Sequence, residues 1–284
     1  MFLIALMSGT FLFVTVILTN VVQTLSLVLL PFSRSAFRRA NREAANAWWA
    51  LCVIWAEKVH RVRPVITGDT LPDNENAFVI ANHQTMPDIV ALMTLAYRKK
   101  RLGDMKWFVK DAIKYVPGIG WGMLYLDCIF LKRDWDRDAD KIQATFSKFL
   151  RDRISVWMMS FPEGTRLSPA KLALAQDFAK KSGHPLPQHV LIPRTRGFAA
   201  TVIGMRTHLG AIYDVTIAYP DRVPTMTELL GQIGGGFHLH VRRYEMASLP
   251  TEADQISAWL VERFREKDAL MEHFSKHGSF VTHR

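Results

Sequence analysis

The 284-residue sequence predicts an α/β fold, with a mostly buried central sheet flanked by helices, an N-terminal transmembrane helix and an interfacial helix. Two observations carry this prediction. Residues 1–33 contain no charged side chain, and from about residue 64 short apolar runs alternate with helical patterns. We therefore expect an anchor over residues 1–33, a basic interfacial helix over 34–63, and one domain over 64–284 that ends in an amphipathic helix.

The first segment is long enough to cross a bilayer, which requires about 20 apolar residues. A signal peptide would begin with basic residues and have a shorter apolar core, whereas this segment begins without any charge. A retained anchor is therefore the favoured interpretation. A buried helix of a soluble protein is the alternative.

The second segment is basic and rich in tryptophan. Residues 34–63 hold seven Lys or Arg and two Glu, a net charge of +5 out of +10 for the whole chain. Arginines directly after an anchor predict that the domain faces the cytoplasm, at the inner membrane in a bacterium. Trp48, Trp49 and Trp55 favour a helix in the headgroup region, although packing on the main domain would also place them.

Because the positive charge is concentrated beside the anchor, it favours a phospholipid surface as the partner and argues against nucleic acid. Cys52 and Cys128 are far apart and form neither a disulfide framework nor a zinc spacing. No metal and no cofactor are expected.

Within residues 64–284, strands are predicted in seven apolar runs, and each is followed by a loop or a helix. A helix should begin at Pro87 and continue to Arg98, since proline is favoured in a first helical turn. The last helix should extend from Thr251, as its N-cap, to about Phe274. The runs are NAFVIAN, KWFVK, CIFLKR, ISVWMMSFPEG, HVLIPRTRGF, AIYDVTIAY and FHLHVRRYEM.

The run NHQTMPD places His83 at a strand end and Asp88 at the following helix start. A carboxylate that binds one ring nitrogen of a histidine fixes its tautomer and leaves the other nitrogen to accept a proton. The four intervening residues allow Asp88 to point back to His83. An ordinary loop histidine followed by an aspartate at a helix N-terminus has the same pattern.

Basic side chains follow three other predicted strands. Lys132 and Arg133 end CIFLKR, Arg166 ends FPEGTR, and LIPRTRGF carries Arg194 and Arg196. Each of them alone could be a solvated surface charge. Together with His83, they are expected at the one rim of the sheet where ligands of open α/β sheets bind.

In this order, the four motifs resemble the glycerolipid acyltransferase family, and most of all its 1-acyl-sn-glycerol-3-phosphate acyltransferases, over roughly residues 60–245. The resemblance implies that His83 is a general base oriented by Asp88. It assigns Pro193, Arg194 and Arg196 to the acyl and acceptor site, where Arg196 replaces a lysine of some relatives and changes the geometry of the charge. The residues implied in phosphate binding are Lys110, Arg133, Glu163, Gly164, Thr165 and Arg166.

The function implied by the resemblance is transfer of a fatty acyl group from a thioester donor, acyl-CoA or acyl-carrier protein, to the free hydroxyl of a lysophospholipid. Lysophosphatidic acid, converted to phosphatidic acid, is the expected acceptor. No G-x-S-x-G sequence is present, so a serine-nucleophile elbow is not expected. A membrane-anchored thioester or phosphoester hydrolase and a non-catalytic lipid-binding adaptor are the alternatives.

Overall fold

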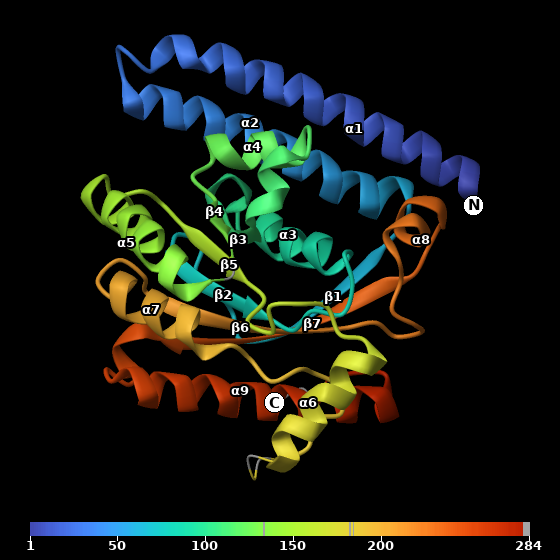
Figure 1. The fold of residues 1–284 in the computed structure, drawn as a ribbon. Coiled ribbons are helices and arrows are strands. Elements are labelled where there is room, and N and C mark those ends of the chain that lie inside the picture. The colour runs from blue at the N-terminus through green and yellow to red at the C-terminus, as the bar shows by residue number, and fades with distance from the viewer. Residues whose placement is uncertain (133, 182, 184, 281–284) are drawn as a thin grey trace. The chain divides into compact units, whose positions relative to one another are not determined.

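The structure is a computed structural model that describes residues 1–132, 134–181, 183 and 185–280 (Figure 1). Its chain divides into two compact units, each made of several segments. Unit 1 comprises Met1–Val62, Leu92–Met159 and Met226–Gly234, and unit 2 comprises Arg63–Ala91, Ser160–Thr225 and Gly235–Arg284. Both units combine parallel strands with helices, which confirms the predicted α/β class.

Unit 1 begins with two long helices, α1 (Phe2–Leu25) and α2 (Arg34–Ile54). A 3₁₀ turn extends α1 to Leu29, and a π-helical turn extends α2 to Val59. Helix α2 begins at Arg34 because the Ser33 hydroxyl accepts a hydrogen bond from the backbone N–H of Ala36. Among the described residues, the helix over Phe2–Leu29 is the one that is long and apolar enough to cross a membrane.

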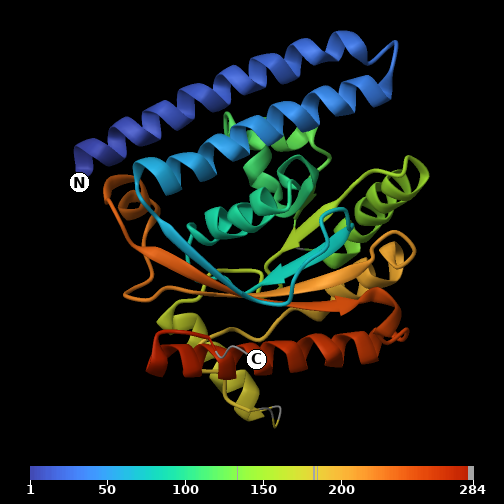
Figure 2. The same ribbon diagram turned by 180° about the vertical axis from the view of Figure 1, so that it is seen from behind.

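Helices α1 and α2 pack against each other through polar contacts along much of their length (Figure 2). Ser8 lies 3.0 Å from the Nε2 atom of His60, and the Trp48 indole donates to Thr15. Near the turn, the side-chain amide of Asn41 donates to Ser26 at 2.8 Å. Ser8, Thr15 and Ser26, three polar residues within the apolar run Phe2–Leu29, thus contact other parts of unit 1.

The rest of unit 1 is built on parallel strands in the order β5-β3-β4. Buried aromatic side chains, among them Trp157 on β5 and Phe146 and Phe149 on α5, form its core. The other elements are β3 (Met105–Lys110), α4 (Ile119–Tyr125), β4 (Ile129–Leu131), α5 (Trp135–Arg151), β5 (Trp157–Ser160) and α8 (Met226–Gly231). Helix α3 (Asp88–Arg98) has its first turn in unit 2 and the remainder in unit 1.

Unit 2 holds four strands in the order β1-β7-β6-β2. Strand β7 is antiparallel to β6, while the β1–β7 and β6–β2 pairs are parallel. Strands β2 and β6 are buried along their whole length. Strand β2 is a continuous apolar run, whereas β6 also buries Asp214 and Thr216. The four strands are β1 (Arg63–Gly68), β2 (Ala77–Ala81), β6 (Ala211–Ala218) and β7 (Gly236–Glu245).

Helices α6 (Pro169–Lys181), α7 (Thr195–Met205) and α9 (Ala253–His277) complete unit 2. Helix α9 lies along the sheet and packs on β6 and α7, as both ribbon views show (Figures 1 and 2). Its Lys267 side chain is fully buried and makes an ion pair of 2.6 Å with Asp214 on β6. This contact fixes α9 to the strand that leads to the candidate site.

Two local predictions are wrong. The run HVLIPRTRGF contains no strand, because the backbone N–H groups of Leu191 and Arg194 bind the loop at residues 162–163 instead of a neighbouring strand. Thr251 is not the N-cap of the last helix. That helix begins at Ala253 with Glu252 in the cap position.

Candidate functional site

The candidate site is built on the loop that follows β2, and Asn82 determines where this loop begins. The Asn82 side chain accepts from the backbone N–H of Ile217 at 2.8 Å and donates to its carbonyl at 3.0 Å. It therefore continues the pairing of β2 with β6 by one position after the strand itself ends. His83 is placed directly beyond a rigid strand end.

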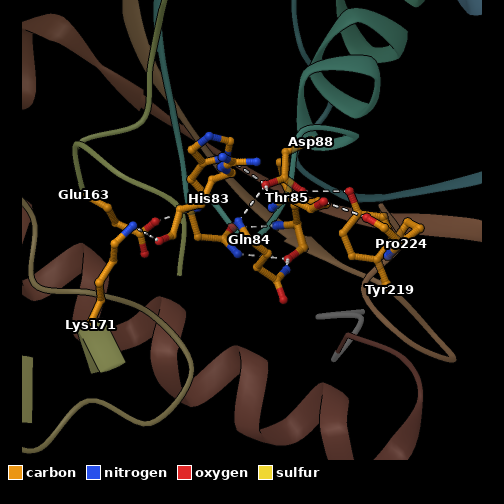
Figure 3. A network of polar contacts seen from close by, with 11 residues as sticks. His83, Gln84, Thr85, Asp88, Glu163, Lys171, Tyr219 and Pro224 are labelled. Atoms are coloured by element: carbon orange, nitrogen blue, oxygen red, sulfur yellow. Dashed lines mark hydrogen bonds and ion pairs between the residues drawn. The ribbon is translucent and has the colours of Figure 1, made fainter. Parts of the chain in front are cut away.

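His83 and Asp88 meet as the sequence predicts (Figure 3). The Nδ1 atom of His83 lies 2.9 Å from the Oδ2 atom of Asp88, whose side chain is fully buried. The same oxygen accepts the backbone N–H groups of Gln84 at 2.6 Å and Thr85 at 2.8 Å. Because Asp88 is the first residue of α3, its carboxylate also lies at the positive end of the helix dipole.

This arrangement determines which nitrogen of His83 is available for chemistry. A carboxylate can only accept, so Nδ1 carries the proton of the shared hydrogen bond and Nε2 keeps its lone pair. The ring stacks on Phe161 with 3.9 Å between centroids and an interplanar angle of 12°. The His83 side chain is 13% exposed, so part of the side chain reaches the surface. The geometry is compatible with the predicted general base, and this role stays a prediction.

Tyr219 completes the surroundings of Asp88 and was not predicted from the sequence. Its hydroxyl donates to the Oδ1 atom of Asp88 at 2.7 Å (Figure 3). Burial and the neighbouring Asp88 charge raise the pKa of Tyr219 well above its usual value, so the phenol keeps its proton. The available signal was a tyrosine directly after β6, at the same sheet edge as His83.

Glu163 connects three loops of unit 2. One of its oxygens accepts the N–H of His83 at 2.6 Å and the other accepts the N–H of Leu191 at 2.8 Å. A third bond, from the N–H of Leu167 to the carbonyl of His83, also joins two of the loops. Since both carboxylate oxygens are used by the backbone, the geometry supports loop positioning by Glu163. The implied part in phosphate binding stays a prediction.

The buried Glu163 predicts a pH dependence of stability. Burial raises the pKa of its carboxyl to about 8, from a usual value of 4.5. The folded state therefore keeps a proton that the unfolded state loses between these values. Stability from this group is fully present below pH 4.5 and is lost as the pH rises towards 8. We expect the thermal midpoint to fall by about 3–6 °C between pH 5.5 and pH 8.5.

In Glu163→Gln, the decrease of the thermal midpoint between pH 5.5 and pH 8.5 should be less than half of the wild-type decrease, because an amide does not titrate. The variant should also be less stable at pH 5.5, since its NH₂ group faces one of the two backbone N–H groups. Glu252→Gln, at an exposed cap position, serves as the matched control and should keep the wild-type pH dependence. Equal pH dependence in wild type and Glu163→Gln would contradict the prediction.

Positively charged groups surround the loop at residues 161–166. Gly164 has a φ of +70°, and a Cβ atom added there would lie 2.9 Å from the Nε atom of Arg194. Lys171 donates to the Thr165 hydroxyl at 2.5 Å. Arg166 and Arg194 are exposed, and neither guanidinium has a hydrogen-bond or ion-pair partner in the part of the chain that the structure describes. They are available to an anionic ligand.

The other predicted site residues have different outcomes. Pro193 is buried before α7, and Arg196 is exposed in the first turn of that helix. Lys110 is the exposed last residue of β3 in unit 1, and Arg133 lies outside the described residues. Within residues 1–132, 134–181, 183 and 185–280, no group of three or more His, Cys, Asp or Glu is placed to hold a metal ion.

Comparisons with known proteins agree with the ordered motifs. A family model described as Acyltransferase matches residues 63–220, and a second, described as Acyltransferase C-terminus, matches residues 229–284. The 1-acyl-sn-glycerol-3-phosphate acyltransferase 2 of Brassica napus is 34% identical over 271 residues, which cover 93% of this chain and 70% of that protein. Lysocardiolipin acyltransferase 1 of Danio rerio is 35% identical over 252 residues, with 87% and 65% covered.

Among solved structures, the 1-acyl-sn-glycerophosphate acyltransferase PlsC from Thermotoga maritima matches with a TM-score of 0.61. The alignment covers 95% of both chains at 17% sequence identity, which shows a shared fold. The resemblance inferred from the motifs is confirmed by the family model and by the relatives. The chain belongs to the acyltransferase family.

Proposed function

We propose that this acyltransferase moves a fatty acyl group from a thioester donor to the free hydroxyl of a lysophospholipid, with lysophosphatidic acid as the acceptor. The observation that carries the proposal is the His83–Asp88 pair, which engages Nδ1 and leaves the lone pair of Nε2 free, on a loop that also contacts the basic FPEGTR segment. The names of the relatives, 1-acyl-sn-glycerol-3-phosphate acyltransferase and lysocardiolipin acyltransferase, support a lysophospholipid acceptor.

In the proposed reaction, Nε2 of His83 takes the proton of the acceptor hydroxyl while its oxygen attacks the thioester carbonyl. The C–O bond forms, and the tetrahedral intermediate then expels the thiolate as the C–S bond breaks. The imidazolium returns its proton to the thiolate. Asp88 stabilises the imidazolium through Nδ1. Because the acceptor oxygen attacks the thioester directly, no covalent acyl-enzyme is required.

Binding of the acceptor phosphate is proposed for Arg166, together with Lys110 and Arg133. Arg166→Ala should raise the KM for lysophosphatidic acid by about 10- to 100-fold, because a charge-assisted contact contributes roughly 1.5–3 kcal/mol. The kcat should stay within about threefold, since the residue acts on binding. Arg265→Ala, which removes an exposed arginine of α9, is the control. A decrease in kcat without a change in KM would contradict this role.

Tyr219 is proposed as a positioning residue for Asp88. Tyr219→Phe should lower kcat by about tenfold, because one carboxylate oxygen loses its donor and Asp88 holds the imidazole less firmly. The thermal midpoint should fall by a few degrees, because a buried carboxylate oxygen loses its donor. The KM values should change little, and this split between kcat and KM separates positioning from a purely structural role. Tyr244→Phe, a hydroxyl deletion on β7 at a ring packed on Trp259, is the control. Equal kcat values for wild type and Tyr219→Phe would contradict the proposal.

Membrane attachment is proposed for α1, with α2 at the interface and the catalytic residues on the cytoplasmic side. The support is the 28-residue apolar helix and the exposed Arg34 and Arg39 that follow it. Acyl-CoA and acyl-carrier protein are both candidate donors.

The function is tested by a transfer assay with the full chain in vesicles, using acyl-CoA and acyl-carrier protein as donors and a panel of lysolipids. We expect phosphatidic acid to form from lysophosphatidic acid faster than the corresponding product from any other lysolipid. Release of free fatty acid that does not require a lysolipid would instead indicate a hydrolase. No reaction with any pair of substrates, together with vesicle binding, would indicate a lipid-binding adaptor.

A further inference from the structure

Unit 1 exposes a second apolar surface besides α1, which we call the 115–124 surface. Five of its large side chains are exposed by 42–71% of their area. Residues 115–126 contain no charge, and the flanking Lys114 and Asp127 are engaged by Asp111 and Lys148. Large apolar side chains that are exposed together within ten residues favour an interaction site. The five residues are Tyr115, Val116, Ile119, Trp121 and Leu124.

The 115–124 surface is fixed against the C-terminal half of α1. A Cβ atom added at Gly118 would lie 2.5 Å from the side chain of Val16, so this side chain packs directly on the Gly118 backbone. Further along, the Gln23 amide lies 3.5 Å from the carbonyl of Gly122. The hydroxyls of Thr24 and Tyr125 are 3.1 Å apart. The ribbon views agree in placing α4 beside the two long helices (Figures 1 and 2).

These contacts determine how deep α4 would lie in a membrane relative to α1. Residues 118–125 lie beside residues 16–24, which belong to the 28-residue apolar stretch Phe2–Leu29. A bilayer that α1 crosses therefore meets α4 at the same level as residues 16–24. Trp121, Tyr115 and Tyr125 are of the types that are enriched at membrane interfaces.

We propose that the 115–124 surface enters the lipid bilayer beside α1, so that a phospholipid membrane is its partner. The proposal rests on the proposed attachment through α1 and extends it from one helix to a surface with two parts. Membrane contact then extends to the segment that joins β3 to β4, which carries Lys110 at one end and leads to Lys132 at the other. Binding of lipid would hold this segment, and with it the ends of both strands, at the membrane surface.

Helix α6 provides the matched control. Leu174 and Phe178 are 69% and 56% exposed, which is comparable to the residues of the 115–124 surface. Charged side chains lie among these apolar residues along α6. The helix therefore has no uncharged stretch as long as residues 115–126. It belongs to unit 2, so it shares no unit with α1.

The first test measures depth directly. Leu124→Cys and Phe178→Cys are each labelled with an environment-sensitive fluorophore in the full chain, which is reconstituted into vesicles of three parts phosphatidylcholine to one part phosphatidylglycerol. Wild type treated with the same reagent corrects for Cys52 and Cys128. Lipids with a quencher on the acyl chain should quench the probe at position 124 at least threefold more than the probe at position 178. Equal quenching at the two positions would overturn the proposal.

The second test uses charge. The combined variant Ile119→Glu, Trp121→Glu and Leu124→Glu should transfer acyl groups to vesicle-embedded lysophosphatidic acid at least fivefold more slowly than wild type. Its rate on the same lipid in detergent micelles should stay within twofold. The control, Leu174→Glu with Phe178→Glu, should match wild type in both assays. A combined variant that matches wild type on vesicles would overturn the proposal.

The outcomes separate this proposal from the proposed function. If wild type does not transfer acyl groups in micelles, the proposed acyltransferase function is contradicted. The measurement of probe depth is unaffected by this result. Wild type that does not remain on vesicles overturns attachment through α1, and the 115–124 proposal with it. If the combined variant does not fold, the fluorescence quenching at positions 124 and 178 tests the proposal by itself. A shift from dimer to monomer in that variant, with an unquenched probe at position 124, would identify a second copy of the chain as the occupant and overturn the proposal.

Discussion

His83→Ala is expected to lower the kcat for acyl transfer by at least about a thousandfold, because it removes the group that we propose takes the proton of the acceptor hydroxyl. The Nε2 atom of His83 has the free lone pair, since Asp88 holds Nδ1. Removing the ring leaves the loop in place, because the backbone N–H and carbonyl of residue 83 keep their bonds to Glu163 and Leu167. The decrease in kcat should therefore come from the missing base and not from a displaced loop.

Steady-state kinetics with both substrates varied will measure this effect. The KM for lysophosphatidic acid should stay within about threefold of the wild-type value, since the proposed phosphate contacts are made by other residues. His277→Ala, an exposed histidine in the last turn of α9, is the matched control and should keep the wild-type kcat. More than a tenth of the wild-type kcat in His83→Ala would exclude His83 as the general base.

The sequence predicts the centre of the candidate site well because that centre is local. His83 and Asp88 are five residues apart, and the strand end and helix start that hold them are both visible in NHQTMPD. The strands of the two units were predicted for a similar reason, since buried strands are continuous apolar runs bounded by polar residues. Strand β1 was missed because it is an exposed edge strand with no such run.

Tyr219 and Glu163 show what local patterns do not contain. The Tyr219–Asp88 hydrogen bond joins residues 131 positions apart, and the two bonds of Glu163 span 80 and 28 positions. These contacts depend on strand order, which the sequence pattern leaves open. The apolar run before Pro193 was mistaken for a strand for the same reason, because its hydrogen-bond partner at Leu191 is a distant carboxylate.

Asp88→Asn is expected to lower kcat by about 10²- to 10³-fold with little change in stability. Three donors converge on Oδ2, namely Nδ1 of His83 and the backbone N–H groups of Gln84 and Thr85. These donors orient the amide of the new asparagine so that its oxygen occupies the position of Oδ2. Its NH₂ group then faces the Tyr219 hydroxyl, which can accept as well as donate.

The Asn variant should therefore keep the tautomer of His83 and lose only the negative charge. In serine proteases the corresponding change costs about 10⁴-fold, because it produces the wrong tautomer. The two backbone N–H groups oppose that outcome here, so we expect a smaller loss. The remaining loss reflects an imidazolium that forms without its counter-charge.

Asp88→Ala should behave differently, because it removes the acceptor of all three donors. The buried N–H groups of Gln84 and Thr85 would lose their partners, at a cost of about 1–3 kcal/mol for each unsatisfied group. We expect kcat to fall about tenfold below that of Asp88→Asn, together with a thermal midpoint lower by several degrees. Asp254→Asn, an exposed aspartate in the first turn of α9, is the matched control for the loss of a helix N-terminal charge. Equal kcat values in Asp88→Asn and wild type would show that the charge of Asp88 has no part in the reaction. Equal losses of stability in Asp88→Asn and Asp88→Ala would show that the new amide does not take the orientation described.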